Sequence, residues 1–222
     1  MLPNPKKLLV AGLLSCLAAF GAPASAAPVI YSNGGPNQVA GNNMSFAYQA
    51  EDFVLASSFT VTDVHFWSLE ASNAYRNGFY WGLYGDAGGS PGAAIASGFQ
   101  GVVTRTITGA VALGDTEILN EFDVTPTGLA AGTYWLVLHN GASNNFTDDG
   151  RDFLWESTAL AIGASGHELL DGIPPWSPNG VEHAFELTGS PVGNIPEPTS
   201  VALMAAGLAG LMVTRLRARR RG

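Results

Sequence analysis

Hydrophobic and polar residues alternate with a period of two through the middle of the chain. The clearest runs place apolar side chains at every second position: Met44, Phe46 and Tyr48; Phe59 and Val61; Phe79, Trp81 and Leu83; Tyr134, Leu136 and Leu138; Phe185 and Leu187. Such alternation is typical of strands with one buried face, and no segment of this region keeps a helical period. The pattern therefore predicts many short β-strands.

Clusters of Gly, Pro, Asn and Asp separate these runs at positions 33–36, 86–92, 140–145 and 174–180. Short antiparallel strands joined by such turns predict an all-β domain, an antiparallel β-sandwich of jelly-roll or Greek-key type. The segment 129–136 resembles the tyrosine corner of Greek-key sandwiches, in which a tyrosine at the start of a strand bonds its hydroxyl to the preceding connection. Tyr134 is therefore predicted to be structural.

The N-terminal pattern differs from that of the middle. Lys6 and Lys7 precede an apolar run at 8–20, and small residues follow at 24–26. This is the layout of a signal peptide, and we expect cleavage between Ala26 and Ala27 by signal peptidase. Cys16 lies within the apolar run, so a lipoprotein processing site is the alternative interpretation. With cleavage after Ala26, the mature chain has no cysteine and no disulfide.

A second apolar run lies near the C-terminus. Pro196, Glu197 and Pro198 precede the run at 199–214, and a basic tail follows, containing Arg215, Arg217, Arg219, Arg220 and Arg221. The prolines limit the helix upstream, the apolar run predicts a short transmembrane helix, and the arginines resist translocation, so they are expected to stay in the cytoplasm. Ala202, Ala206 and Gly210 form a small-residue stripe that is either a helix-packing face or ordinary membrane-helix composition.

This ordered tail resembles the PEP-CTERM sorting signal of Gram-negative bacteria. The resemblance covers about the last 28 residues, with Pro196, Glu197 and Pro198 in the position of the motif. It implies a membrane processing enzyme, exosortase, as a partner, and it associates the protein with exopolysaccharide and biofilm production. The segments 50–53 and 128–140 also look like stretches of uncharacterised PEP-CTERM ectodomains, a similarity that concerns fold and not activity.

The predicted organisation has four parts: a signal peptide at 1–26, a β-sandwich ectodomain at 27–188, a linker at 189–195 and the sorting signal at 196–222. From 27 to 194 the chain carries three arginines, no lysine and 17 carboxylates, a formal charge of −14. Such a field repels phosphate backbones and anionic lipid surfaces, which argues against nucleic-acid binding. We expect export across the inner membrane, with the chain anchored before tail processing and at the cell surface or in the matrix after it.

Candidate catalytic chemistry is sparse in the predicted domain. Residues 88–92 fit the G-x-S-x-G pattern, but Pro91 lacks the backbone NH that an oxyanion hole requires after the serine. His65, His139, His167 and His183 show no zinc-ligand spacing. We therefore predict no catalytic residues, with a secreted carbohydrate-active enzyme as the alternative.

Two groups of residues are candidates for ligand binding. Asp148, Asp149 and Asp152 lie in a loop rich in the oxygen ligands that calcium takes, although Asx-rich turns are also ordinary in β proteins. Trp135 lies on the strand face opposite Tyr134, and Trp176 lies in a proline-rich loop, so either ring is a candidate glycan contact or a core residue. These observations predict a non-catalytic matrix protein that contacts exopolysaccharide, with no cofactor other than the candidate calcium.

Overall fold

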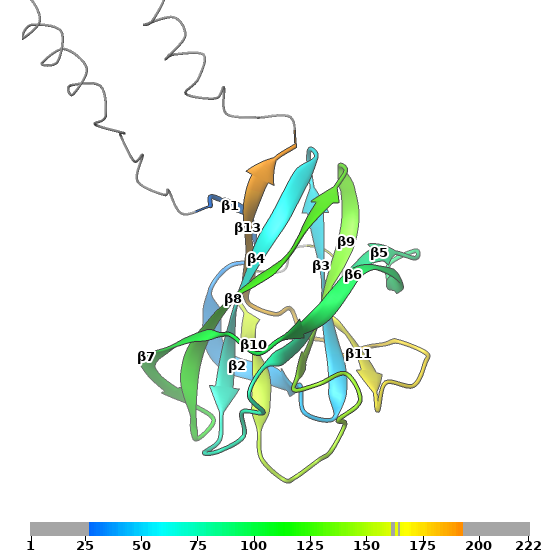
Figure 1. Ribbon diagram of the computed structural model, residues 1–222. Helices are drawn as coiled ribbons and strands as arrows, with labels where there is room; N and C mark the ends of the chain where they lie inside the picture. Colours follow the sequence, from blue (N-terminus) through cyan, green and yellow to red (C-terminus); the bar gives the residue numbers. More distant parts are fainter. Residues whose placement is uncertain (1–26, 161–162, 164, 193–222) are drawn as a thin grey trace, which may run out of the picture.

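The computed structural model describes residues 27–160, 163 and 165–192. The regular secondary structure of these described residues consists of β-strands alone. The strands form two antiparallel sheets (Figure 1). The all-β sandwich predicted from the alternation is thus confirmed. The expected signal peptide and the expected membrane helix at 199–214 lie outside the described residues. Within the described ranges there is no helix of the length and hydropathy that crossing a bilayer requires.

The first sheet is organised around β4 (Phe59–Glu70), its central long strand. One edge of β4 pairs with β13 (Phe185–Pro191) and, further along, with β10 (Phe153–Thr158). Its other edge pairs with β8 (Asp115–Leu129). The outer strands of this sheet are β1 (Val29–Ser32), β2 (Pro36–Asn43) and β7 (Thr104–Ala112).

The second sheet has the order β12-β11-β3-β9-β5-β6. Its centre consists of β3 (Ala47–Leu55), β9 (Gly132–Asn140) and β5 (Phe79–Asp86). The flanking strands are β6 (Pro91–Gln100), β11 (His167–Leu170) and the two-residue β12 (Ser177–Pro178). The segment 88–92 lies at the β5–β6 turn, where Asp86 Oδ1 accepts a hydrogen bond from Gly89 N at 3.0 Å.

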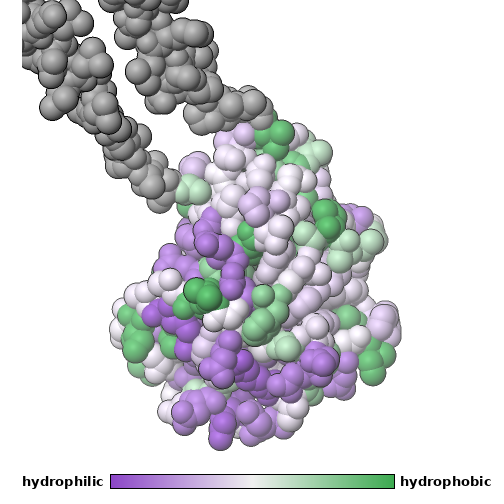
Figure 2. Space-filling view, viewed as in Figure 1, coloured by the Kyte–Doolittle hydropathy of each residue, from purple (hydrophilic) through white to green (hydrophobic). Residues whose placement is uncertain are grey.

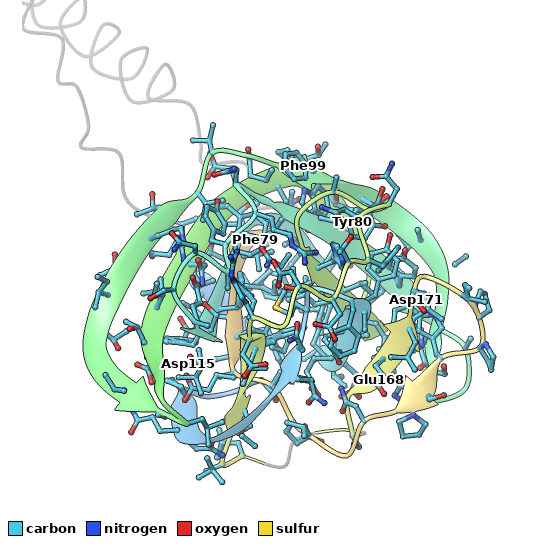
Figure 3. The ribbon with its side chains drawn as sticks, turned by 90° about the horizontal axis from the view of Figure 1, so that it is seen from below. Phe79, Tyr80, Phe99, Asp115, Glu168 and Asp171 are labelled. Atoms are coloured by element: carbon cyan, nitrogen blue, oxygen red, sulfur yellow. The ribbon has the colours of Figure 1, made fainter. Side chains whose placement is uncertain are left out.

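The main core lies between the sheets, as the view along the sandwich shows (Figure 3). Inward-facing positions of both sheets supply it, and many of these side chains are aromatic. Phe66 of β4 meets Phe79 of β5 edge to face with ring centroids 5.0 Å apart. Full burial of such a side chain contributes about 1.5 to 3 kcal/mol. Most of the alternating runs thus supply one shared hydrophobic layer. The run Met44, Phe46 and Tyr48 is the exception, because 44–46 form a bend before β3 and Tyr48 lies outside the main core.

The tyrosine corner is present as predicted. The Tyr134 hydroxyl, near the start of β9, donates a hydrogen bond to the Ala130 carbonyl oxygen at 3.1 Å. Its ring packs against Phe53 with a centroid distance of 5.7 Å. Tyr134 therefore ties the β8–β9 connection to the core.

The end of the domain lies further along the chain than the sequence predicted. Residues 189–191, expected in the linker, continue β13 and pair with the first residues of β4. Val192 N also donates to the Ser58 carbonyl oxygen at 3.0 Å. Gly189 lacks a side chain, so its backbone can approach Thr60 closely. The strand therefore continues through this glycine, which the sequence pattern had assigned to the linker.

The two ends of β4 define the two ends of the sandwich. Pro191, where the described chain is about to leave the domain, pairs with Phe59 at the start of β4. Glu70 is the last residue of the same 12-residue strand. At about 3.3 Å per residue, β4 separates these ends by roughly 35 Å. On the face drawn in Figure 2, strongly hydrophilic residues gather at the end far from Pro191.

Candidate functional site

The outer face of the second sheet carries an aromatic cluster separate from the main core. Ala50, Trp135 and Val137 are buried there, and four half-buried rings pack on them: Tyr48, Tyr80, Tyr84 and Trp176. We call these four rings the aromatic face. A ring cluster on the outside of a sandwich is not needed to close the core, so it is the first candidate for a binding surface.

Alternation and strand register bring the aromatic face together. On β5, Tyr80 and Tyr84 point away from the core because their neighbours Phe79, Trp81 and Leu83 point into it. The register places Gly82 beside Val137, and Val137 beside Ala50. These small central residues leave room for the tyrosine rings. A Cβ on Gly82 would lie 2.4 Å from the Tyr84 ring, so the absence of a side chain at 82 lets that ring lie over the strand.

Trp176 reaches this face from the loop between β11 and β12. Its ring lies 6.5 Å from Tyr48 and 6.3 Å from Tyr84, between centroids. Tyr48 in turn lies 4.9 Å from Tyr80. Trp176 is half-buried, so part of its ring is presented to solvent together with the tyrosines.

Trp135 differs from the expectation that it offers a ring to a glycan. It does point away from the core, but its side chain is fully buried. Its Nε1 donates to Asp86 Oδ1 at 2.9 Å, and His167 covers the ring at a centroid distance of 4.8 Å. The expected contact at Trp135 is therefore corrected: this ring is the floor on which the aromatic face rests, because a second layer of side chains covers it.

Burial affects two of the phenol groups of the aromatic face, Tyr48 and Tyr84. Burial raises the pKa of Tyr48 to about 12. Burial, together with the Tyr80 hydroxyl, also raises the pKa of Tyr84. The Tyr80 and Tyr84 hydroxyls lie 3.0 Å apart, and the Tyr48 hydroxyl donates to the Ser143 carbonyl oxygen at 2.8 Å. The face therefore combines ring planes with hydroxyl donors and acceptors, and the raised pKa values keep those of Tyr48 and Tyr84 uncharged.

The three aspartates of the candidate calcium loop have separate partners. Asp148 Oδ1 accepts from Gly150 N at 2.9 Å, and Asp152 Oδ1 accepts from the Asn43 side chain at 3.4 Å. Asp149 lies 3.8 Å from both Arg76 and Arg151. Among the described residues no three His, Cys, Asp or Glu side chains are placed to hold a metal ion. The structure does not bring these carboxylates together as a ligand set.

The four histidines lie in four different environments. His65 lies on the first sheet, 3.8 Å from Glu121. His139 lies at the edge of the aromatic face, where burial lowers its pKa to about 4. His167 packs on Trp135, and His183 is buried against Glu51. His139 and His167 thus border the aromatic face, whereas His65 and His183 lie elsewhere.

The tyrosines of the aromatic face were missed in the sequence. Tyr48 and Tyr134 look alike in the alternation, yet only Tyr134 packs against the main core. The pair Tyr80 and Tyr84 flanking Gly82 was the available signal, because an aromatic pair around a glycine on the outer face of a strand marks a place where a ring or another molecule approaches closely.

The chain carries a known sorting motif. The PEP-CTERM protein-sorting motif matches residues 194–221, which include Pro196, Glu197, Pro198 and the basic tail. A search of curated proteins found none that matches the chain. The motif implies export, membrane anchoring before processing, and an exosortase-like membrane enzyme as the processing partner. The residues of the motif lie outside those that the structure describes.

Proposed function

Because the chain carries a PEP-CTERM sorting motif, we propose that it is a non-catalytic glycan-binding protein of the cell surface or biofilm matrix. In this proposal signal peptidase cuts after Ala26 and exosortase processes the tail. The β-sandwich then contacts exopolysaccharide through the aromatic face. The observation that carries the proposal is the set of four half-buried rings held outside the core by β3, β5 and the β11–β12 loop.

The chemistry of the aromatic face suits sugar rings. Aromatic planes pack against apolar faces of other molecules, while phenol and indole groups also supply hydrogen bonds. The rings of Tyr48, Tyr80 and Tyr84 are carried by strands of a rigid sheet, so little conformational entropy is lost when a ligand orders them. Their hydroxyls can donate and accept hydrogen bonds, which suits the hydroxyl groups of a saccharide.

The position of the aromatic face also supports the proposal. Tyr80 pairs with His139 near the end of β9, toward the end of the sandwich that lies away from Pro191 (Figure 1). The membrane-directed tail follows Pro191 in the sequence. An anchored domain would therefore hold this surface away from its attachment.

The binding test uses the mature protein, purified from its own host after the host has processed it. Trp176→Ala removes a half-buried ring, and we expect binding to the host's own exopolysaccharide to weaken by about 1 to 3 kcal/mol, by analogy with base stacking on aromatic rings. Trp67→Ala is the matched control, because Trp67 is also half-buried but belongs to β4 in the first sheet. The affinity of each variant and of the wild type for the exopolysaccharide is measured by pull-down or calorimetry, and only Trp176→Ala should lower it.

The melting temperatures of both variants must be measured alongside binding. Equal weakening by Trp67→Ala and Trp176→Ala, or wild-type protein that retains no exopolysaccharide, contradicts the proposal. Shortening of the polysaccharide during incubation would instead identify a carbohydrate-active enzyme.

A further inference from the structure

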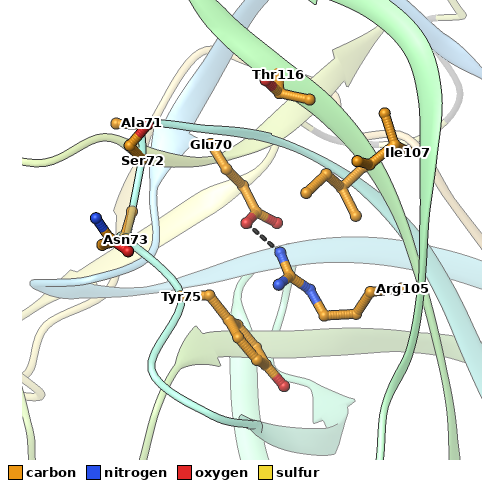
Figure 4. Close-up of a pocket in the computed structure, with 10 residues that line it drawn as sticks. Glu70, Ala71, Ser72, Asn73, Tyr75, Arg105, Ile107 and Thr116 are labelled. Carbon is orange, nitrogen blue, oxygen red and sulfur yellow. Dashed lines mark hydrogen bonds and ion pairs between the residues drawn. The ribbon is translucent and has the colours of Figure 1, made fainter.

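A hollow of about 400 Å³ opens at the Glu70 end of the sandwich (Figure 4). The end of β4, the loop that follows it, and β7 and β8 line the hollow. Arg105, Tyr75 and Glu70 form its polar side, and Ile107 and Ile118 form an apolar wall. Its volume is within the range of small-molecule sites, about 300 to 1,000 Å³.

Strand register explains why polar groups line this hollow. Phe66 of β4 points into the core, so Ser68 and Glu70, two and four residues later, point to the same side. β8 places Ile118 opposite Ser68, and β7 places Ile107 opposite Ile118. The inner face of the first sheet therefore changes from aromatic core to polar hollow toward the end of β4.

Hydrogen bonds fix the charged groups before any ligand arrives. Arg105 pairs with Glu70 Oε2, and its Nε donates to Asn120 Oδ1 at 3.1 Å. Asn120 Nδ2 donates to Ser68 Oγ at 2.7 Å, and Ser68 Oγ donates to Glu70 Oε1 at 2.6 Å. The guanidinium also lies 3.9 Å above the ring of Tyr75. A site held in this way loses little entropy on binding.

The electrostatics of the hollow favour an uncharged ligand. Glu70 and Arg105 balance each other, and each keeps further capacity to accept or donate hydrogen bonds. Burial and the nearby carboxylates of Asp152 and Glu70 raise the pKa of Asp115, which shows that negative charge already crowds this end. An anionic ligand would be repelled by those carboxylates, and a cationic ligand would be repelled by Arg105. Hydroxyl groups can bond to both members of the pair.

We propose that this hollow is a second binding site, which takes a neutral sugar unit at the end of a glycan chain. The sugar hydroxyls bond to the Glu70 carboxylate and the Arg105 guanidinium. The C–H face of the ring packs on the isoleucine wall formed by Ile107 and Ile118. This site shares no residue with the aromatic face, so either site can exist without the other.

The test measures binding of methyl glycosides to the protein purified as its host processes it. The probes are the methyl glycosides of glucose, galactose, mannose and N-acetylglucosamine, with methyl glucuronide as the charged comparison. Ile107→Trp fills the hollow, and we expect binding to weaken by roughly tenfold or more. Val111→Trp is the matched control on the same strand, because Val111 is 70% exposed and Ile107 is 69% exposed, but Val111 does not line the hollow.

A second variant tests the polar side. Arg105→Lys keeps the charge but removes the planar fork, so we expect weaker glycoside binding with the melting temperature recorded alongside. Binding of no neutral glycoside, a preference for the glucuronide, or unchanged affinity in Ile107→Trp overturns the proposal. Ile107→Trp should cause the same loss of glycoside affinity in a Trp176→Ala background as in the wild type, which separates this site from the aromatic face.

Discussion

Glu51 is a fully buried carboxyl group beside a fully buried histidine. Its Oε2 accepts a hydrogen bond from His183 N at 2.9 Å and shares a hydrogen bond of 2.8 Å with His183 Nδ1. The Glu182 side chain is a further hydrogen-bond partner of the Glu51 carboxyl group. Asp52 and Glu182 add further carboxyl groups near it.

The contact between Glu51 and His183 is a hydrogen bond between neutral groups. Burial raises the pKa of Glu51 to about 9, although hydrogen bonds partly oppose the shift. Burial lowers the pKa of His183 to about 3. An ion pair would need a charged form of each group, and burial disfavours both charged forms. The folded state therefore holds a proton on this acid at neutral pH.

The protonated Glu51 predicts that stability falls as pH rises from 7 to 9. In the unfolded chain a glutamate ionises near 4.5, so above pH 7 the folded state binds more protons than the unfolded state. The unfolding free energy should drop by about 2 kcal/mol over this window. Glu182 and Glu156, whose pKa values burial raises to about 7, act in the same direction.

Denaturant titrations at several pH values between 7 and 9 measure this slope. His183 and His139 are neutral in the folded state and mostly neutral in the unfolded chain there, so they oppose the slope only slightly and only near pH 7. Glu51→Gln keeps the shape and an acceptor for His183 while removing the titration, and it should flatten the dependence. An unfolding free energy that rises with pH in the wild type would show that Glu51 is ionised in the fold.

At the scale of single elements, the tyrosine corner joins β8 to β9. The hydroxyl of Tyr134 bonds back to Ala130, four residues earlier, across the turn that separates Leu129 from Gly132. This bond lies beside the Phe53 ring of the main core. It fixes how β9 enters the second sheet, and β9 pairs with both β3 and β5.

Tyr134→Phe removes only the hydroxyl of this corner. We expect a loss of about 1 kcal/mol in unfolding free energy, the usual net value of one intramolecular hydrogen bond. Tyr80→Phe is the comparison, because it removes a hydroxyl that bonds to Tyr84 on the outer face. If Tyr134→Phe and the wild type are equally stable in chemical denaturation, the packing of the Tyr134 ring stabilises the corner and its hydroxyl contributes nothing.

At the scale of the whole molecule, one end of the sandwich leads to the sorting motif and the other carries the hollow. β13 ends at Pro191, beside the start of β4, and the matched motif begins three residues later at 194. The hollow lies at the end of β4. Cleavage in the tail would thus release the domain without touching either proposed binding site.

Changing Pro196 and Glu197 together to alanine should block this cleavage. We expect the variant to remain as a longer, membrane-held form, because the processing enzyme no longer recognises the motif. Membrane fractionation with mass spectrometry of the C-terminus measures it. Val192→Ala is the control, since Val192 is exposed and precedes the matched residues. If the wild type, the double variant and Val192→Ala all have the same size and location, the tail is an anchor that is not cleaved at this motif.

For most strands the sequence by itself determined which residues share a strand face; the run Met44, Phe46 and Tyr48 was wrong, because a bend at 44–46 separates Met44 from the strand of Tyr48. Alternation identified Phe79, Trp81 and Leu83 as inward positions, and all three are in the core. It was less informative for β6 and β7, where small residues and threonines are mostly exposed on both faces and give no contrast between buried and solvated positions. The sorting motif was also readable, because short ordered motifs are recognised without a fold.

Only the tertiary structure decided what covers each face. Alternation placed Trp135 opposite Tyr134, but the burial of Trp135 depends on His167, which arrives from a strand 32 residues away in the sequence. The hollow likewise needs Glu70 and Arg105, 35 residues apart, to meet when β7 pairs with β8 and β8 pairs with β4. Local periodicity reports the direction of a side chain within its own strand. The neighbours it meets depend on long-range strand pairing, which the period of a single segment does not contain.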